Sequence, residues 1–282
     1  MKHLNLLKIE SKIYKTILLF FIFLFSFANS QSKRFYYVMN YKIDTLSTYK
    51  TDLMVLEINE KNNYFFSDEY LKADSISSRT KKQIIPQPVF EDIIIWNKSS
   101  QEFSFIKTLS MNFYKYNSVK KINWSITNEI KKIGSYNVRK AKTNFSGRNW
   151  TAWFCDEIPL PYGPYFFYGL PGLILEVYDD DSNFYFSFFK NYNFKENSNT
   201  DKLIEKATGS FLVNIKEVDW KAVQINYYNN PMSEYKNGDA YMTKDNGEVF
   251  TANDYKNMEL QIQNQIKSFN NPIELSEKIH YK

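Results

Sequence analysis

Hydrophobic and polar positions alternate along most of the chain, and a period of two residues predicts β-strands rather than helices. The alternation is clearest in a hairpin whose arms, residues 136–145 and 148–155, flank the dipeptide Ser146-Gly147. A two-residue loop that contains glycine suits a tight turn between paired strands. Further strands are expected at residues 34–43, 51–58, 64–66, 93–96, 102–107, 112–116, 122–126, 173–178 and 184–189.

Short polar turns between successive strands favour an antiparallel meander. The period changes near the C-terminus, where apolar residues recur at intervals of three and four: Tyr255, Met258, Ile262, Ile266 and Phe269. This stripe predicts one amphipathic helix, with Asn253 as its N-cap, whose apolar side packs on the sheet. The expected fold class is therefore mainly β, an antiparallel curved sheet or half-barrel with one C-terminal helix.

Three segments show no clear period. Residues 68–92 are polar and are expected to form an irregular excursion that includes one helical turn, and residues 191–208 are expected to form a polar connection. Residues 211–218 fit a strand or a helix, and a strand is favoured.

In residues 156–172, prolines restrict the backbone dihedral angles and glycines permit unusual ones. This segment contains four of the eight prolines and three of the eight glycines: Pro159, Pro161, Pro164, Pro171, Gly163, Gly169 and Gly172. We expect that Gly169 or Gly172 has a positive φ or lies where a Cβ atom would clash. If the segment is structural, Leu170, Leu173 and Ile174 are buried; if it is a recognition surface, they form an exposed apolar patch beside Trp150 or Trp153. The structural interpretation is favoured.

The same region carries a family signature. The sequence Gly169-Leu170-Pro171-Gly172-Leu173-Ile174 stands unbroken, Gly163-Pro164 precedes it, and Asn271-Pro272-Ile273-Glu274-Leu275 follows near the C-terminus. With Gly134, Tyr136, Phe145, Gly147-Arg148 and Trp153, these residues resemble the pattern of the GLPGLI family of exported bacterial proteins. Val138 departs from it, since family members often have cysteine there. The resemblance implies one β-rich domain over residues 31–282, exported to the periplasm or cell exterior of a Gram-negative bacterium, with no established activity.

The N-terminus reads as a secretory signal peptide. Four lysines precede an apolar run, residues 17–27, and the small-residue pattern Ala28-Asn29-Ser30 follows it. The alternative, a membrane anchor, is disfavoured because a spanning helix needs roughly 18 or more apolar residues. No transmembrane segment is expected after cleavage.

Composition excludes several function classes. Removal of residues 1–30 takes away four lysines and one glutamate, so the net charge falls from +5 to +2 and gives no support for nucleic-acid binding. Cys155 is the only cysteine, and His280 is the only histidine outside the leader. No internal disulfide, metal site or cofactor is therefore expected, and a Ser-His or Cys-His mechanism is disfavoured. The run 179–181 is interpreted as a solvated turn rather than a cation site.

The hairpin supplies the candidate binding residues. Arg148, Trp150 and Trp153 could form a ligand platform or the core of the hairpin, and Asp156 or Glu157 is expected to pair with Arg148. The favoured function is a non-enzymatic binding or accessory protein for an envelope protein, a peptide or an apolar ligand. The alternative is a carboxylate-dependent hydrolase with Arg148, Asp156 and Glu157 in its site. An enzyme predicts a pocket in which an acid with a raised pKa meets a second polar group.

The leader generates the first testable prediction. Cleavage between Ser30 and Gln31 is expected when the full chain is expressed in a Gram-negative host, because the apolar run and the small-residue pattern end there. Intact-mass measurement of the exported protein checks this, and a mass that includes residues 1–30 would contradict it.

Overall fold

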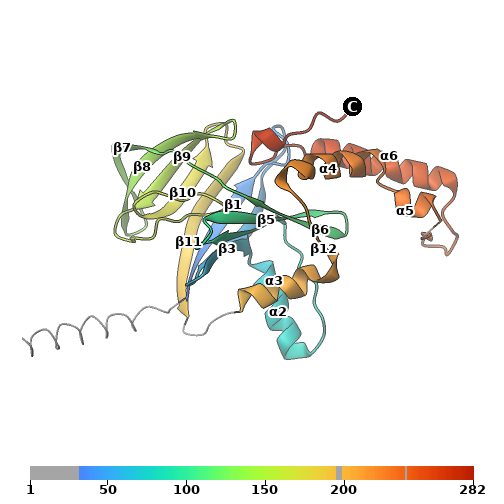
Figure 1. The fold of residues 1–282 in the computed structure, drawn as a ribbon, viewed down its shortest axis with the longest axis horizontal. Coiled ribbons are helices and arrows are strands. Elements are labelled where there is room, and N and C mark those ends of the chain that lie inside the picture. Colours follow the sequence, from blue (N-terminus) through green and yellow to red (C-terminus); the bar gives the residue numbers. More distant parts are fainter. Residues whose placement is uncertain (1–31, 195–198, 239) are drawn as a thin grey trace, which may run out of the picture.

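A single curved sheet of twelve strands dominates the computed structural model, which describes residues 32–194, 199–238 and 240–282. The strand order is β12-β6-β5-β4-β3-β2-β1-β11-β10-β9-β8-β7, and the sheet is open (Figure 1). Neighbouring strands are antiparallel except for the parallel pair β12 and β6. The strands are β1 (Ser32–Tyr41), β2 (Lys50–Ile58), β3 (Asn62–Ser67), β4 (Ile93–Asn97), β5 (Glu102–Leu109), β6 (Asn112–Ser118), β7 (Ser125–Ile133), β8 (Tyr136–Phe145), β9 (Arg148–Cys155), β10 (Leu173–Asp179), β11 (Phe184–Phe194) and β12 (Leu212–Asn214).

Strand β1 joins two arms of the sheet. On one side it pairs with β2, which leads through the meander to β6; on the other it pairs with β11, with Ser32 opposite Phe194, which leads back to β7. The arm from β7 to β10 curls toward the viewer's left in Figure 1, and the arm from β2 to β6 lies to its right. The first strand therefore depends on a partner that comes late in the chain.

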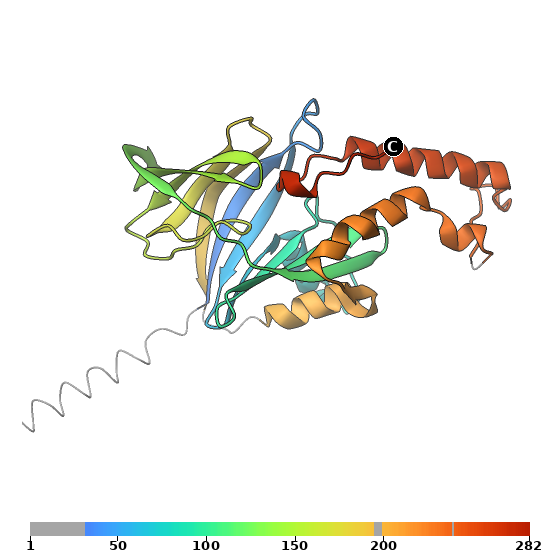
Figure 2. The ribbon, with the colours of Figure 1, turned by 45° about the horizontal axis from the view of Figure 1, so that its top comes forward.

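The helices lie on more than one face of the sheet, because Trp220, the first residue of one of them, packs in the main core. They are α2 (Glu69–Thr80), α3 (Thr200–Thr208), α4 (Trp220–Asn229), α5 (Ser233–Lys236) and α6 (Ala252–Ser268). Helices α2 and α3 cover the opposite face of β2 and β3, where Val55, Phe66, Tyr70 and Ile204 form a second buried cluster. Helices α4 and α6 run side by side and extend away from the sheet (Figures 1 and 2).

Residues 156–172, the signature segment, fill the concave face between the two arms. The ring of Tyr165 packs against Phe65 of β3 at 6.2 Å between centroids. On the other arm, Phe166 packs against Phe145 at 5.1 Å, and Phe167 packs against Trp150 at 4.7 Å. All three segment rings are buried. One segment thus supplies the central part of the core.

The two glycines of the motif confirm the backbone prediction for different reasons. Gly169 has a φ of +95°, and a Cβ atom added there would meet open space. A Cβ atom on Gly172 would lie 2.1 Å from the carbonyl oxygen of Cys155. Within the signature segment, Gly163 also has no room, since its Cβ would lie 2.8 Å from the Cβ of Ile174, and Pro164 is buried.

The apolar residues of the motif are buried, as the structural interpretation predicts. Leu170 is 1% exposed, and Leu173 and Ile174 are fully buried, whereas Pro171 is exposed. Each large apolar side chain removed from water contributes roughly 1.5–3 kcal/mol. The motif is therefore a packing element of the core.

The mainly β, open curved sheet with a C-terminal helix is confirmed. Helix α6 begins at the N-cap Thr251, whose side chain accepts from the amide of Asp254, so the expected N-cap at Asn253 is wrong by two positions. Its apolar stripe is half-buried, and it reaches the sheet at its C-terminal end, where the Lys50 ammonium of β2 lies 4.6 Å from the centre of the Phe269 ring. The expected hairpin is also confirmed, with Ser146 and Gly147 both at positive φ.

Helices α3, α4 and α5 were not expected, and α2 is longer than predicted. Helix α2 occupies twelve residues where a single helical turn was predicted, and α3 occupies half of the expected polar connection. The buried positions of α2 include Ser77, which weakens its helical period. In α3, Leu203, Ile204 and Ala207 do stand at helical spacing and pack on the second cluster, and the sequence interpretation missed them. Residues 212–214 form a strand between two short 3₁₀ turns, and α4 follows. Strand β7 begins at Ser125, whereas residues 122–126 were predicted.

Substitution of the two motif glycines distinguishes backbone strain at Gly169 from a steric clash at Gly172. Gly169→Ala is expected to cost about 1–2 kcal/mol of unfolding free energy, because only the left-handed backbone is penalised. Gly172→Ala is expected to cost more than about 3 kcal/mol, because the backbone around Cys155 must move. Urea unfolding of both variants gives the comparison, and equal losses would contradict this explanation.

Candidate functional site

The C-terminal residues 271–277, the closing segment, lie across one end of the curved sheet and are held there by Arg148. The Arg148 Nε donates to the carbonyl oxygen of Ile273 at 3.0 Å, and Nη2 donates to the carbonyl oxygen of Pro272 at 2.8 Å and to Asn271 Oδ1 at 2.6 Å. Nη1 donates to Asp179 Oδ2 at 3.1 Å. The guanidinium of β9 thus ties the closing segment to the end of β10.

Asp179 is held as firmly as the arginine it pairs with. Its Oδ1 accepts from the amides of Asn183 at 2.7 Å and Phe184 at 2.6 Å, and it is 1% exposed. The expectation of a solvated turn therefore fails for Asp179, although Asp180 and Asp181 are exposed. Burial lowers the pKa of the Arg148 guanidinium and Asp179 opposes that change, so the arginine keeps its charge.

A second anchor involves Lys120 and Glu274. The Lys120 Nζ lies 2.9 Å from Glu274 Oε2 and 3.1 Å from Glu217 Oε1. Ser146, at the hairpin turn, donates to Glu274 and lies 2.8 Å from the hydroxyl of Ser276. Burial raises the pKa of Glu274, whose Oε1 has no hydrogen-bond partner among the described residues. The closing segment is thus held mainly through polar contacts.

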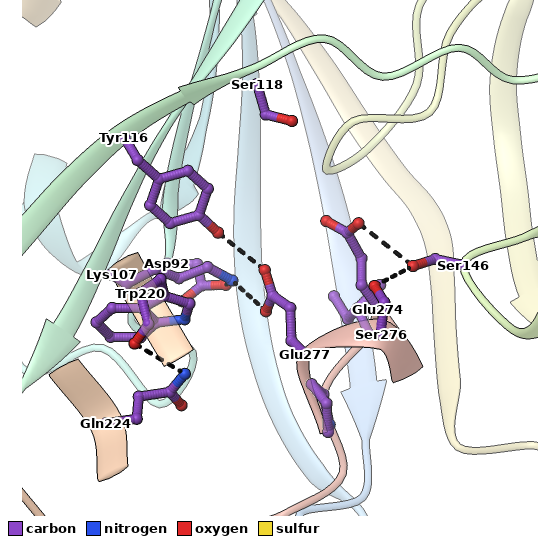
Figure 3. A network of polar contacts seen from close by, with 12 residues as sticks. Asp92, Lys107, Tyr116, Ser118, Ser146, Trp220, Gln224, Glu274, Ser276 and Glu277 are labelled. Atoms are coloured by element: carbon purple, nitrogen blue, oxygen red, sulfur yellow. Dashed lines mark hydrogen bonds and ion pairs between the residues drawn. The ribbon is translucent and has the colours of Figure 1, made fainter. Parts of the chain in front are cut away.

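A third group of buried charges surrounds Lys107 of β5 (Figure 3). Its Nζ lies 2.6 Å from Asp92 Oδ2, 3.2 Å from the Tyr165 hydroxyl and 3.6 Å from Glu277 Oε2. Tyr116 donates to Glu277 Oε1 at 2.9 Å. Tyr165 belongs to the signature segment and has a φ of +57°. The sheet, the signature segment and the closing segment therefore meet at one lysine.

Burial and charge act in opposite directions in this group. Burial alone would lower the pKa of Lys107, but Asp92 and Glu277 outweigh it and raise that pKa well above its usual value. Burial raises the pKa of Asp92, and Lys107 opposes that increase. The lysine is therefore a permanent cation that two carboxylates share.

A cavity of about 350 Å³ opens beside these charges. This volume lies within the range of small-molecule sites, roughly 300–1,000 Å³. Its polar side is formed by Glu91, Asp92, Lys107 and Glu277. Its apolar and aromatic walls come from β1, β11, α4, α6, the loop before β4 and residues that follow β1 and α6: Tyr41, Ile43, Phe90, Phe184, Trp220, Ile266, Phe269, Ile273 and Tyr281. This cavity is the candidate functional site.

The residues predicted as a ligand platform do not form one. Arg148 and Trp150 project toward the core, where the guanidinium lies 4.9 Å from the ring centre of Phe184 and Trp150 packs on Phe167. Trp153 contacts other partners, with the Lys131 ammonium 4.4 Å from its ring centre. All three side chains are buried. They are parts of the hairpin core, the alternative left open by the sequence.

The predicted pairing of Arg148 with Asp156 or Glu157 is wrong. Asp156 pairs with Arg139 at 3.0 Å, and both acids are exposed. Arg148 and Asp156 lie eight residues apart along an extended strand, which separates them by about 26 Å. The three residues proposed for a hydrolase site therefore do not converge.

Sequence reasoning missed the charged residues of the cavity. Asp92, Lys107 and Glu277 come from three distant parts of the chain, and none stands in a recognisable motif. The sequence contains one usable signal, the segment Asn271–Leu275 of the family pattern. Two of its residues are anchored in the structure, since Asn271 accepts from Arg148 and Glu274 pairs with Lys120. No cluster of three or more His, Cys, Asp or Glu suited to a metal ion occurs within the described ranges.

A double-mutant cycle tests the anchoring of the closing segment. Arg148→Met is expected to cost about 3–5 kcal/mol of unfolding free energy, since it leaves Asp179 buried and unpaired. The double variant, Arg148→Met with Asp179→Leu, should lose less unfolding free energy than the two single variants lose together.

Arg139→Met is the matched control, because it removes an exposed pair worth at most about 1 kcal/mol. The measurement is urea unfolding. A small loss for Arg148→Met, equal to that of Arg139→Met, would refute the anchoring role.

Comparison with known proteins gives limited similarity. Residues 143–176 match a family described as "Protein of unknown function (Porph_ging)". That segment includes β9, the signature segment and the start of β10, and the wider resemblance to GLPGLI proteins stays a prediction. No curated protein matches the chain.

Solved structures match the chain with low sequence identity and low TM-scores. Two structures of PNGF-II, in space groups P21 and C2, match 68% of this chain with 14% and 15% identity and TM-scores of 0.47 and 0.48. The chain spans 32% of the length of PNGF-II. A putative outer membrane lipoprotein-sorting protein domain from Vibrio parahaemolyticus matches 64% of this chain and 93% of its own length, with 11% identity and a TM-score of 0.27. By sequence, then, the chain is similar to a family of unknown function across its central motif.

Proposed function

We propose that the protein is a non-enzymatic binding protein that holds a small, partly apolar ligand in the cavity beside Lys107. The observation that carries the proposal is the composition of that cavity, about 350 Å³ of space with aromatic walls and a group of fixed charges on one side. Ligand sites are mostly apolar, with a few polar groups that orient the ligand. The closing segment lines this site directly, and the signature segment supports it through Tyr165, which contacts Lys107.

The rigidity of the charged group supports binding rather than chemistry. Lys107 is held by Asp92, Glu277 and Tyr165 at once, and Tyr116 donates to Glu277. These groups are held in place by other groups of the protein. A preformed surface loses little entropy when a ligand binds.

A second candidate is an acid–base enzyme at the same cavity. Asp92 has a raised pKa and lies beside Lys107 and Tyr165, which is the kind of convergence that favours catalysis. The earlier alternative, a hydrolase at Arg148, Asp156 and Glu157, has no such convergence. Hydrolysis of small ester or glycoside substrates that Asp92→Asn abolishes, without loss of thermal stability, would favour this candidate.

Location in the cell envelope is part of the proposal. The N-terminal leader lies outside the described residues, so its support is the pattern of the sequence. None of the helices in the described ranges combines the length and apolar character that a membrane crossing requires. A protein or peptide partner in the envelope is compatible with ligand binding, and affinity capture from the native envelope with mass-spectrometric identification tests it.

Filling the cavity tests the binding proposal. Titration with 2-phenylethanol, a small neutral aromatic probe, is expected to give saturable shifts in NMR spectra of the wild-type protein. Gln224→Trp should abolish this binding, because residue 224 of α4 lines the cavity.

Lys221→Trp is the matched control, since Lys221 lies on the same helix but is exposed and does not line the cavity. It should bind the probe as the wild type does. Absence of saturable binding to the wild type, or undiminished binding to Gln224→Trp, would overturn the proposal.

A further inference from the structure

We infer that the cavity selects an uncharged ligand, an alcohol or phenol with an apolar body, whose hydroxyl group donates to Asp92; this rests on the proposed binding function. Asp92 lines the cavity, and its side chain is 18% exposed. Its Oδ2 is occupied, because Lys107 donates to it at 2.6 Å and the Tyr165 hydroxyl donates to it at 3.3 Å. Its Oδ1 accepts no hydrogen bond from the described residues, and it is accessible to solvent. One carboxylate oxygen is therefore open to a ligand.

The lysine beside this oxygen has no donor to spare. An ammonium group carries three N–H donors. Three oxygens surround that of Lys107, from Asp92 at 2.6 Å, Tyr165 at 3.2 Å and Glu277 at 3.6 Å. A ligand group that only accepts hydrogen bonds would have to displace one of them. An ionised carboxylate accepts and does not donate, so the ligand has to supply the donor for Asp92 Oδ1.

The charges around the cavity balance, so they favour no charged ligand. Three carboxylates and three lysines surround it: Glu91, Asp92, Glu277, Lys42, Lys50 and Lys107. The Lys50 ammonium lies 4.6 Å from the centre of the Phe269 ring, in the cavity wall. Burial raises the pKa of Glu91, and Lys50 opposes that increase. A charged ligand would lose hydration without meeting an uncompensated opposite charge, and a hydroxyl group avoids that cost.

The open acceptor is placed before any ligand arrives. The amides of Val89 and Phe90 donate to Asp52 Oδ2 at 3.0 and 2.9 Å, and Tyr41 donates to the carbonyl oxygen of Val89 at 2.6 Å. These contacts hold the segment that leads to Asp92. Preorganisation of this kind reduces the entropy lost on binding. The aromatic walls then contact the apolar body of the ligand.

Four probes of similar size test the inference: 2-phenylethanol, its methyl ether, 2-phenylethylamine and phenylacetate. Affinities are measured by calorimetry at pH 7. The alcohol should bind about tenfold more tightly than the ether, which keeps the oxygen but lacks the donor, because a hydrogen bond to a charged group is a strong one. The amine and phenylacetate should bind at least about threefold more weakly than the alcohol, because each loses the hydration of its charge.

Asp92→Asn should remove the preference for a donor. The side-chain oxygen of the variant stays on Lys107, which has no acceptor, so the amide group takes the place of Oδ1 and donates into the cavity. The ratio of alcohol to ether affinity is then expected to fall to about one, since both probes can accept. Asp245→Asn, at an exposed acid outside the cavity lining, is the matched control and should keep the wild-type ratio.

Thermal unfolding of each variant confirms that it is folded, and the wild-type ranking tests the inference even if Asp92→Asn does not fold. If the ether or a charged probe binds the wild type as tightly as the alcohol, the choice of ligand is overturned while the binding function stands. An unchanged ratio in a folded Asp92→Asn variant has the same consequence. If none of the four probes binds, both the choice of ligand and the binding function fail.

Discussion

An open, curved sheet has a concave face that must be filled, and in this protein residues 156–172 fill it. A closed barrel joins its edges by strand pairing, whereas here the rings of Tyr165, Phe166 and Phe167 connect the two arms through packing. The path of the segment is possible because Gly172 passes within van der Waals contact of the backbone at Cys155, where no other residue fits. The position of Tyr165 then fixes one partner of Lys107, and with it one side of the cavity.

The sequence was sufficient for the strands and for the packing role of the motif. Alternation identified the hairpin of β8 and β9, and the density of proline and glycine identified a segment with a dictated backbone. It was not sufficient for α2 and α3, whose buried faces include Ser77, Thr200 and Thr208. In α2 the buried hydroxyl group weakens the apolar period. Helix α3 is only nine residues long, and its apolar residues Leu203, Ile204 and Ala207 stand among charged ones.

The charged partners could not be predicted because they depend on strand register rather than on distance along the chain. Arg148 has acids eight and nine residues ahead of it, but an extended strand carries it away from both. Its partner, Asp179, comes from the neighbouring strand, since β9 and β10 are antiparallel and place Trp150 opposite Asp179. Likewise, Asp92, Lys107 and Glu277 meet only after the loop, the sheet and the C-terminus have been assembled.

The pairing of β1 with β11 has a consequence for how the chain folds. Tyr37 donates a hydrogen bond to the carbonyl oxygen of Ile174, 137 residues further along. Contacts at such separations slow folding, because loop-closure entropy is lost before the contacts form. The first strands leave the ribosome long before their partners exist, and their aromatic side chains stay without a core until residues 156–194 have been made. Completion of the core is therefore expected to be a late step, which follows the synthesis of residues 156–194.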